Sequence, residues 1–284
     1  MYATINGCKL YYEIHGKENG EPIFFIHGGP GMGDCRGDIK AFSPLGDHYK
    51  LIFLDMRGSG RSEDVPPYTH QQWIQDIEEL RNYLGLGKIK IVGGSYGGFL
   101  TLEYVLQYQE NVTHVILRDT APSSNYNDLS MEKALNSNLP GINEEMLERL
   151  FHGQVKSNEE FKEMFAAIQP LYTVVIDEEA NRKRLENMYF HYATHNYAFS
   201  ENKPKYNLIE KLHKIKVPVL VTVGRHDWVT PVICSEDIAH QIESSSLVIF
   251  ENSGHSPHLE ENQEYLELVR GFVGAGPLSQ SFRK

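Results

Sequence analysis

Short apolar runs alternate with amphipathic segments over the first 120 residues of the chain. Four of these runs are typical of buried strands: 22–26 (PIFFI), 51–54 (LIFL), 89–92 (IKIV) and 112–117 (VTHVIL). Between them, 69–84 places Trp73, Ile77 and Leu80 at helical spacing after Thr69, a residue type that caps helices, and 99–108 predicts a second helix. Because the strands are apolar almost throughout, the pattern predicts a mostly parallel sheet with helices on both faces.

This alternation of strand-like and helix-like segments is absent between residues 121 and 205, where the sequence is polar, helix-like and rich in Glu and Asn (EEMLERL, SNEEFKEMFAAI). It resumes with strands at 217–223 and 247–250, a helix after Pro231 and a last helix over 260–272. We therefore expect one α/β domain built from 1–120 and 206–276. The segment 121–205 is expected to be a helical insertion, and 277–284 a C-terminal tail.

Charge and cysteine content narrow the functional classes. The 284 residues include 27 Lys and Arg against 38 Asp and Glu, a net charge of −11, which argues against binding nucleic acid or an anionic membrane. Cys8, Cys35 and Cys234 form no CxxC pair and no disulfide framework, and the first residues lack the pattern of a signal peptide. No apolar stretch approaches the roughly 20 residues of a membrane span. These features predict a cytoplasmic protein.

The motif GGSYGG at 93–98 lies between the strand 89–92 and the helix that follows it. A serine at this place sits on a sharp strand-to-helix turn, and the glycines beside it allow the strand and helix to approach closely. The turn would project the Ser95 hydroxyl out of the sheet as a nucleophile. The alternative is an ordinary glycine-rich loop, but the strand-turn-helix setting favours the nucleophile.

A catalytic serine needs a base and an acid that orients the base. His255 follows the strand 247–250, and Asp227 follows the strand 217–223, so both are expected at the carboxyl edge of the sheet, where active sites form. The order Ser95, Asp227, His255 is the order found in α/β-hydrolases. Three residues nearby in sequence remain rivals for these roles: His226, His258 and Glu251.

The motif HGGPG at 27–31 follows the strand 22–26. In the α/β-hydrolase fold this loop donates one backbone N–H to the oxyanion hole, and the residue after the nucleophile donates the other. The motif therefore nominates Gly29 and Tyr96. A further motif, DMRGSGRS at 55–62, lacks the spacing of a dinucleotide or phosphate loop. We interpret it as a turn in which Asp55 and Arg57 bond the backbone under the site, and we expect no cofactor.

The residues argue against two other classes of function, a metalloenzyme and a non-catalytic binding protein. His191 and His195 are four residues apart, but HYATH lacks the glutamate of a zinc-binding HExxH helix, so no metal site is predicted. A non-catalytic binding protein would have no use for a strained nucleophile turn, and the complete set of catalytic residue types argues against it.

Taken together, HGGPG, DMRGSGRS, GGSYGG and the loops of Asp227 and His255 resemble the proline iminopeptidase family of α/β-hydrolases. The resemblance implies an α/β-hydrolase fold, a helical cap, which matches 121–205, and removal of an N-terminal residue, often proline, from a peptide. Members of the family commonly carry an acidic residue after the triad aspartate, where it holds the substrate ammonium. This chain has Trp228 there, which makes Trp228 a candidate substrate-binding residue.

The expected function is therefore a serine hydrolase that works through an acyl-enzyme, with an aminopeptidase acting on small peptides as the first interpretation. That activity would require a cap glutamate near the site, because a buried ammonium needs a carboxylate partner. Four glutamates are candidates for it: Glu144, Glu145, Glu148 and Glu201. The alternative is a carboxylesterase or lactonase that acts on small uncharged acyl groups.

Overall fold

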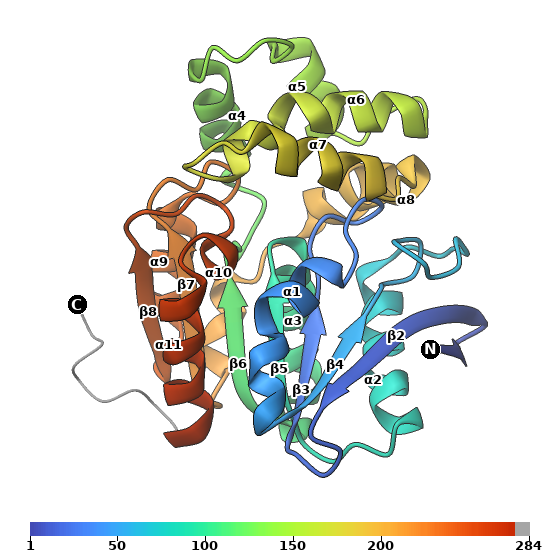
Figure 1. The fold of residues 1–284 in the computed structure, drawn as a ribbon, viewed down its shortest axis with the longest axis vertical. Helices are drawn as coiled ribbons and strands as arrows, with labels where there is room; N and C mark the ends of the chain where they lie inside the picture. Colours follow the sequence, from blue (N-terminus) through green and yellow to red (C-terminus); the bar gives the residue numbers. More distant parts are fainter. Residues whose placement is uncertain (276–284) are drawn as a thin grey trace.

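The computed structural model describes residues 1–275 (Figure 1). The tail expected at 277–284 lies outside these described residues. Among residues 1–275, no helix combines the length and the apolar character that crossing a membrane would require.

The centre of the molecule is an eight-stranded sheet in the order β1-β2-β4-β3-β5-β6-β7-β8. β1 and β2 pair antiparallel with each other, β2 pairs antiparallel with β4, and every other pairing is parallel. The predicted parallel sheet is thus present, with an antiparallel hairpin added at one edge. The strands are β1 (Tyr2–Ile5), β2 (Cys8–Gly16), β3 (Pro22–Ile26), β4 (Lys50–Leu54), β5 (Ile89–Gly94), β6 (Val112–Arg118), β7 (Val219–Gly224) and β8 (Ser245–Phe250).

Helices cover both faces of this sheet, which explains why its central strands are apolar throughout. On β3, Ile23 and Phe25 pack into the core beneath one set of helices, whereas Phe24 and Ile26 pack into the core on the opposite face. One face is covered by α1 (Arg36–Phe42) and α11 (Asn262–Ala275). The other is covered by α2 (His70–Tyr83), α3 (Tyr96–Tyr108) and α9 (Val232–Gln241).

Local signals set several helix ends. Thr69 caps α2 as predicted, its side chain accepting a hydrogen bond from the Gln72 amide at 3.1 Å. The helix expected from residue 99 begins earlier, at Tyr96, because it follows the turn at Ser95 directly. The helix expected over 260–272 is divided into α10 (Pro257–Glu260) and α11.

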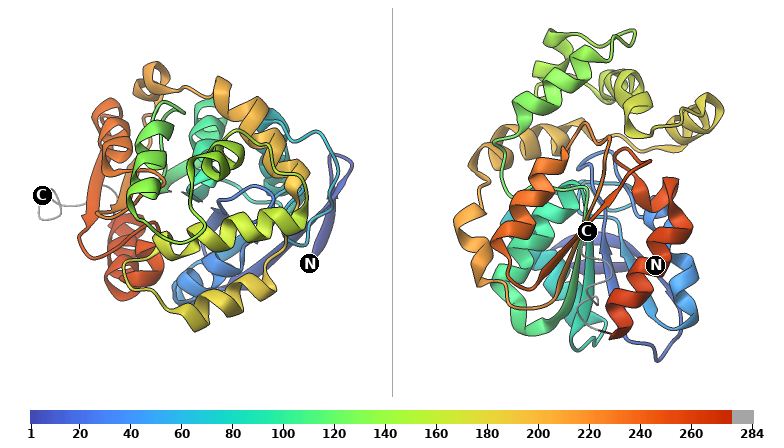
Figure 2. Two further views of the ribbon diagram at one scale, coloured as in Figure 1. Left: turned by 90° about the horizontal axis from the view of Figure 1, so that it is seen from above. Right: turned by 90° about the vertical axis from the view of Figure 1, so that its left-hand side faces the viewer.

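A layer of helices lies above the carboxyl ends of the strands (Figure 1), and the view from above shows it spread across the sheet (Figure 2). All of it comes from the segment 121–205, and we call this segment the cap. The cap contributes the aromatic residues Phe151, Phe161 and Phe165 to a core that also contains Trp228 from the loop after β7. Its helices are α4 (Asn127–Asn136), α5 (Glu144–Phe151), α6 (Asn158–Ile168), α7 (Glu178–Asn187) and α8 (Tyr192–Tyr197).

Short helical turns connect several of these elements. After α8 the chain makes a π-helical turn over Ala198–Asn202 and a 3-10 turn over Lys203–Lys205, which return it toward the sheet. The remaining 3-10 turns are Ser43–Asp47, Gln109–Asn111, Gln169–Tyr172 and Ile209–Lys214.

Candidate active site

Ser95 occupies a strained turn between β5 and α3. Its backbone angles are φ 52° and ψ −124°, a conformation that side-chain-bearing residues rarely adopt. Two contacts hold it there: its amide donates to the Arg118 carbonyl at 2.8 Å, and its carbonyl accepts from the Thr120 hydroxyl at 2.8 Å. A Cβ atom at Gly97 would collide with the backbone oxygens of Ile26 and His27, so the glycine permits this close approach.

Asp227 and His255 meet at the carboxyl edge of the sheet. His255 Nδ1 lies 2.8 Å from Asp227 Oδ2, and both side chains are buried. Asp227 is itself fixed, because it accepts hydrogen bonds from the amides of Val229 at 2.8 Å and Thr230 at 3.0 Å and from the Thr230 hydroxyl at 2.9 Å. Burial alone would lower the pKa of His255, but the Asp227 carboxylate more than offsets it, and the pKa is raised from its usual 6.5.

Ser95 and His255 line the same cavity, which has a volume of about 810 Å³ beneath the cap. Gly29, Tyr96 and Trp228 line it as well. Gly28 packs against the nucleophile turn, since a Cβ atom there would come within 2.7 Å of Ser95 Cβ. The structure therefore brings Ser95, His255 and both expected oxyanion residues to one cavity, and Asp227 lies behind His255 without lining it.

The rival residues lie in other environments. His258 stacks on Phe42, with ring centroids 5.9 Å apart, and burial lowers its pKa well below the usual value. His226 is exposed, and Glu251 pairs with Arg225 at 2.7 Å on the surface. Asp227 is therefore the carboxylate in contact with His255 Nδ1.

Asp119 is a second acid that the sequence interpretation missed. It directly follows β6 with φ 49°, is fully buried, and accepts a hydrogen bond from the Gly224 amide at 3.2 Å. Its Oδ2 has no partner among residues 1–275, and polar atoms of Asp119, Asp227 and His255 lie within 4.8 Å of one another. Burial, together with the charge of Asp227, raises the pKa of Asp119 to about 8. Asp119 could have been found from the sequence because it follows a predicted strand, 112–117, just as Asp227 follows the predicted strand 217–223.

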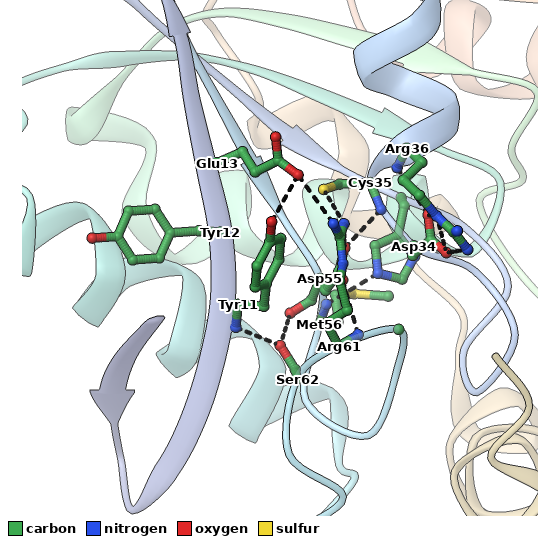
Figure 3. A network of polar contacts seen from close by, with 12 residues as sticks. Tyr11, Tyr12, Glu13, Asp34, Cys35, Arg36, Asp55, Met56, Arg61 and Ser62 are labelled. Carbon is green, nitrogen blue, oxygen red and sulfur yellow. Dashed lines mark hydrogen bonds and ion pairs between the residues drawn. The ribbon is translucent and has the colours of Figure 1, made fainter. Parts of the chain in front are cut away.

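The loop that carries HGGPG is tied to the loop after β4 (Figure 3). The fully buried Asp55 carboxylate accepts from the Cys35 amide at 2.8 Å and from Arg61 Nε at 2.8 Å. The Met56 amide donates to His27 Nε2 at 3.0 Å. Arg57 has a different partner, because it pairs with Asp76 at 2.7 Å and donates to backbone carbonyls. Asp55 thus anchors the chain next to the nucleophile turn.

The cap glutamates proposed as ammonium partners are not at the site. Glu144, Glu145, Glu148 and Glu201 are all exposed, and none of them lines the cavity. The reason is helical geometry, because the apolar face of α5, with Leu147, Leu150 and Phe151, points inward and leaves its glutamates outside.

Four other carboxylates line the cavity, and each is engaged. Asp34 pairs with Arg36 at 2.5 Å, and Asp38 pairs with Arg118 at 2.6 Å. Asp177 caps α7 by accepting from the Ala180 amide at 2.9 Å. Glu260 accepts from the amides of Val174 at 2.6 Å and Gly254 at 2.8 Å. Asp34 and Asp38 are thus paired with arginines, whereas Asp177 and Glu260 accept hydrogen bonds from backbone amides alone.

Comparisons with known proteins agree with this architecture. A family profile described as the alpha/beta hydrolase fold matches residues 21–262. Proline iminopeptidase PfmaB of Pestalotiopsis fici is 37% identical over 277 residues, which cover 96% of this chain and 98% of that protein. A proline iminopeptidase of Saccharolobus solfataricus is 31% identical and covers 96% of this chain and 91% of its own.

Solved structures show the same fold. An esterase from Exiguobacterium antarcticum superposes with a TM-score of 0.76 at 23% identity, covering 96% of this chain and 99% of its own. The enol-lactonase from Burkholderia xenovorans LB400 superposes with a TM-score of 0.77 at 20% identity, covering 96% and 100%. The mostly parallel sheet predicted from the apolar runs is confirmed as this fold.

Proposed function

This chain belongs to the proline iminopeptidase family of α/β-hydrolases, a family of serine hydrolases, and from that premise we propose that it acts through an acyl-enzyme on Ser95. The observation that carries the proposal is the fixed Asp227–His255 pair, whose histidine lines the same cavity as the strained serine. Strained backbone conformations of this kind cluster at active sites, where the surrounding structure maintains them.

In this scheme Ser95 Oγ attacks the substrate carbonyl while His255 Nε2 accepts its proton. Asp227 holds Nδ1 and stabilises the imidazolium that forms. The backbone N–H groups of Gly29 and Tyr96 receive the negative charge on the carbonyl oxygen, each contributing about 3 kcal/mol in the transition state. His255 then protonates the leaving group, and water attacks the acyl-enzyme with His255 again as base. These residues need no cofactor for the reaction.

We propose an aminopeptidase that releases an N-terminal residue, of the proline type, from small peptides. Its support is the set of relatives named proline iminopeptidase, which match nearly the full length of this chain. The buried, unpaired Cys8, Cys35 and Cys234 also support a reducing, cytoplasmic setting for this enzyme.

A second candidate is a carboxylesterase or lactonase. The specific observation in its favour is that Asp34 and Asp38 are paired with arginines and that the expected cap glutamates lie outside the cavity, since a substrate ammonium needs a carboxylate partner. Trp228, which is buried against Phe151 and Tyr172, also gives the site an apolar wall.

Three substrates separate the two candidates: prolyl-β-naphthylamide, its N-acetylated form and a short p-nitrophenyl ester. An aminopeptidase cleaves the free amide and loses that activity on acetylation, because the ammonium is its anchor. An esterase turns over the ester rapidly and leaves both amides intact. Equal cleavage of the free and acetylated amides would contradict ammonium recognition. Ser95→Ala is the control in every assay, and wild-type rates in that variant would contradict the acyl-enzyme itself.

A further inference from the structure

Lys203 is a buried lysine that lines the catalytic cavity, and no residue of the described range 1–275 serves as its counter-ion. It follows the π-helical turn Ala198–Asn202, its side chain is 7% exposed, and it lines the cavity. Its Nζ lies 4.8 Å from the ring centre of Phe151 and 4.7 Å from that of Phe199. Among residues 1–275, Nζ has no hydrogen-bond or ion-pair partner and makes cation–π contacts with these two rings.

This position destabilises the folded chain, because a buried ammonium without a partner loses its hydration. The cation–π contacts offset only part of that free-energy cost. The titratable groups that interact with Lys203 from the packed elements are His195 and Cys234. Burial lowers the pKa of His195 to about 4 and raises that of the Cys234 thiol, so both are uncharged at neutral pH. Neither supplies the missing negative charge.

The lining of the cavity carries an excess of cations although the whole chain is acidic. Six Lys and Arg residues and four Asp and Glu residues line it, whereas the chain as a whole has 27 and 38. Two of the four acids, Asp34 and Asp38, are paired with lining arginines as described above. Lys40 on α1 and Arg184 on α7 lie at exposed positions of the lining, where they favour the entry of anions, whereas Lys183 pairs with Glu179 at 2.6 Å.

We propose that Lys203 is a binding subsite for a carboxylate carried by the substrate, on its acyl half or on its leaving half. This inference rests on the proposed acyl-enzyme at Ser95 and specifies its substrate class. The single ammonium of Lys203 can pair with one monoanionic group such as a carboxylate. Because Lys203 and Ser95 line the same cavity, one substrate could carry both this carboxylate and the carbonyl that Ser95 attacks. The same charge disfavours a substrate ammonium at this place.

A dependence on pH follows from the burial of this amine. Burial lowers the pKa of Lys203 to about 7, so the empty site loses its charge as the pH rises above neutrality. Binding a carboxylate favours the ammonium form and requires uptake of a proton at higher pH. As the pH is raised beyond about 7, the KM for an anionic substrate should therefore increase, whereas the KM for a neutral analogue should not show this increase.

The test compares two pairs of esters on the full-length chain. One pair places the carboxylate on the acyl half, as mono-p-nitrophenyl glutarate against p-nitrophenyl valerate. The other places it on the leaving half, as 4-acetoxybenzoate against phenyl acetate. The quantity measured is the ratio of kcat/KM for the anionic ester to that for its neutral partner. Lys203→Met should lower this ratio about tenfold or more in one pair, which identifies the half that carries the charge.

Lys205→Met is the matched control, since Lys205 is exposed and pairs with Glu201; its ratios should equal those of the wild type. A change of less than fivefold in both pairs on Lys203→Met would overturn the proposal. Should Lys203→Met not fold, inhibition of wild-type ester hydrolysis decides instead: pentanoate should inhibit more strongly than pentanamide, and equal inhibition would contradict the carboxylate subsite. If the wild-type enzyme did not hydrolyse the neutral esters, or if Ser95→Ala hydrolysed them as fast as the wild type, the result would instead count against the acyl-enzyme.

Discussion

Replacing Lys203 by Met should stabilise the folded chain, by an amount that depends on pH. The pKa of Lys203 is about 7 in the folded chain, against 10.5 for an unperturbed lysine. Between these two values the unfolded chain binds more protons than the folded chain, so the stability of the wild type rises with pH. Below about pH 7 both states are charged and the penalty is at its largest. Above about pH 10.5 both states are neutral and the penalty disappears.

The size of the effect follows from the two pKa values. At about 1.4 kcal/mol per pKa unit, a difference of about 3.5 corresponds to roughly 4 kcal/mol at pH 7, falling to about 1 kcal/mol at pH 10. Methionine fits beside Phe151 and Phe199 without a charge, so Lys203→Met should recover most of this free energy.

The assay is urea denaturation of wild type, Lys203→Met and the exposed control Lys205→Met at pH 7 and pH 10. We expect a large gain in the free energy of unfolding for Lys203→Met at pH 7, a small gain at pH 10, and none for Lys205→Met at either. The same gain at both pH values, or no gain at pH 7, would refute the reasoning. A stabilised variant with weakened selectivity for anionic esters would show that the wild type retains the lysine for function.

Further predictions concern the residues around the nucleophile. Asp227→Asn should lower kcat by roughly 10³ to 10⁴-fold, because the amide favours the wrong tautomer of His255, and a loss below tenfold would indicate that Asp119 takes over the role. Ser95→Gly should be more stable than Ser95→Ala by about 1 to 2 kcal/mol in thermal or urea unfolding, since glycine relieves the positive φ that alanine retains; equal stabilities would mean that the turn is unstrained. Hydrolysis of a neutral ester should rise with pH through a midpoint above 6.5, because His255 must be neutral to accept a proton and its pKa is raised; a midpoint below 6.5 would contradict this. Asp55→Asn should cost about 1 to 3 kcal/mol in urea unfolding, since Cys35 and Arg61 would lose a charged acceptor while Arg61 keeps Glu13 as a second partner, and a loss below about 1 kcal/mol would show that the contact does not hold the loop.

The apolar runs predicted the parallel part of the sheet because each central strand is buried on both faces. The antiparallel hairpin was not predicted. Its strands, β1 and β2, are half-exposed at the edge, where burial alternates along Tyr2–Ile5 and polar residues interrupt the pattern. That alternation is the signal from which the hairpin could have been predicted.

The positions of Ser95, Asp227 and His255 were predictable because strand ends converge on one edge of a parallel sheet. The same argument applies to Asp119, which directly follows β6. The lining of the cavity was not predictable, because the inward face of each cap helix depends on how the helices pack. The exposed Glu144 and the buried Lys203 both lie in polar stretches of sequence, and only their packing distinguishes them.

The central claim is a covalent acyl-enzyme on Ser95 that depends on His255. The most direct measurement is peptide mapping by mass spectrometry after reaction with a fluorophosphonate, for wild type and for Ser95→Ala. The account predicts a single modified peptide, the one that contains Ser95, and no modification in Ser95→Ala. Modification of a different residue, or equal labelling of Ser95→Ala, would contradict it.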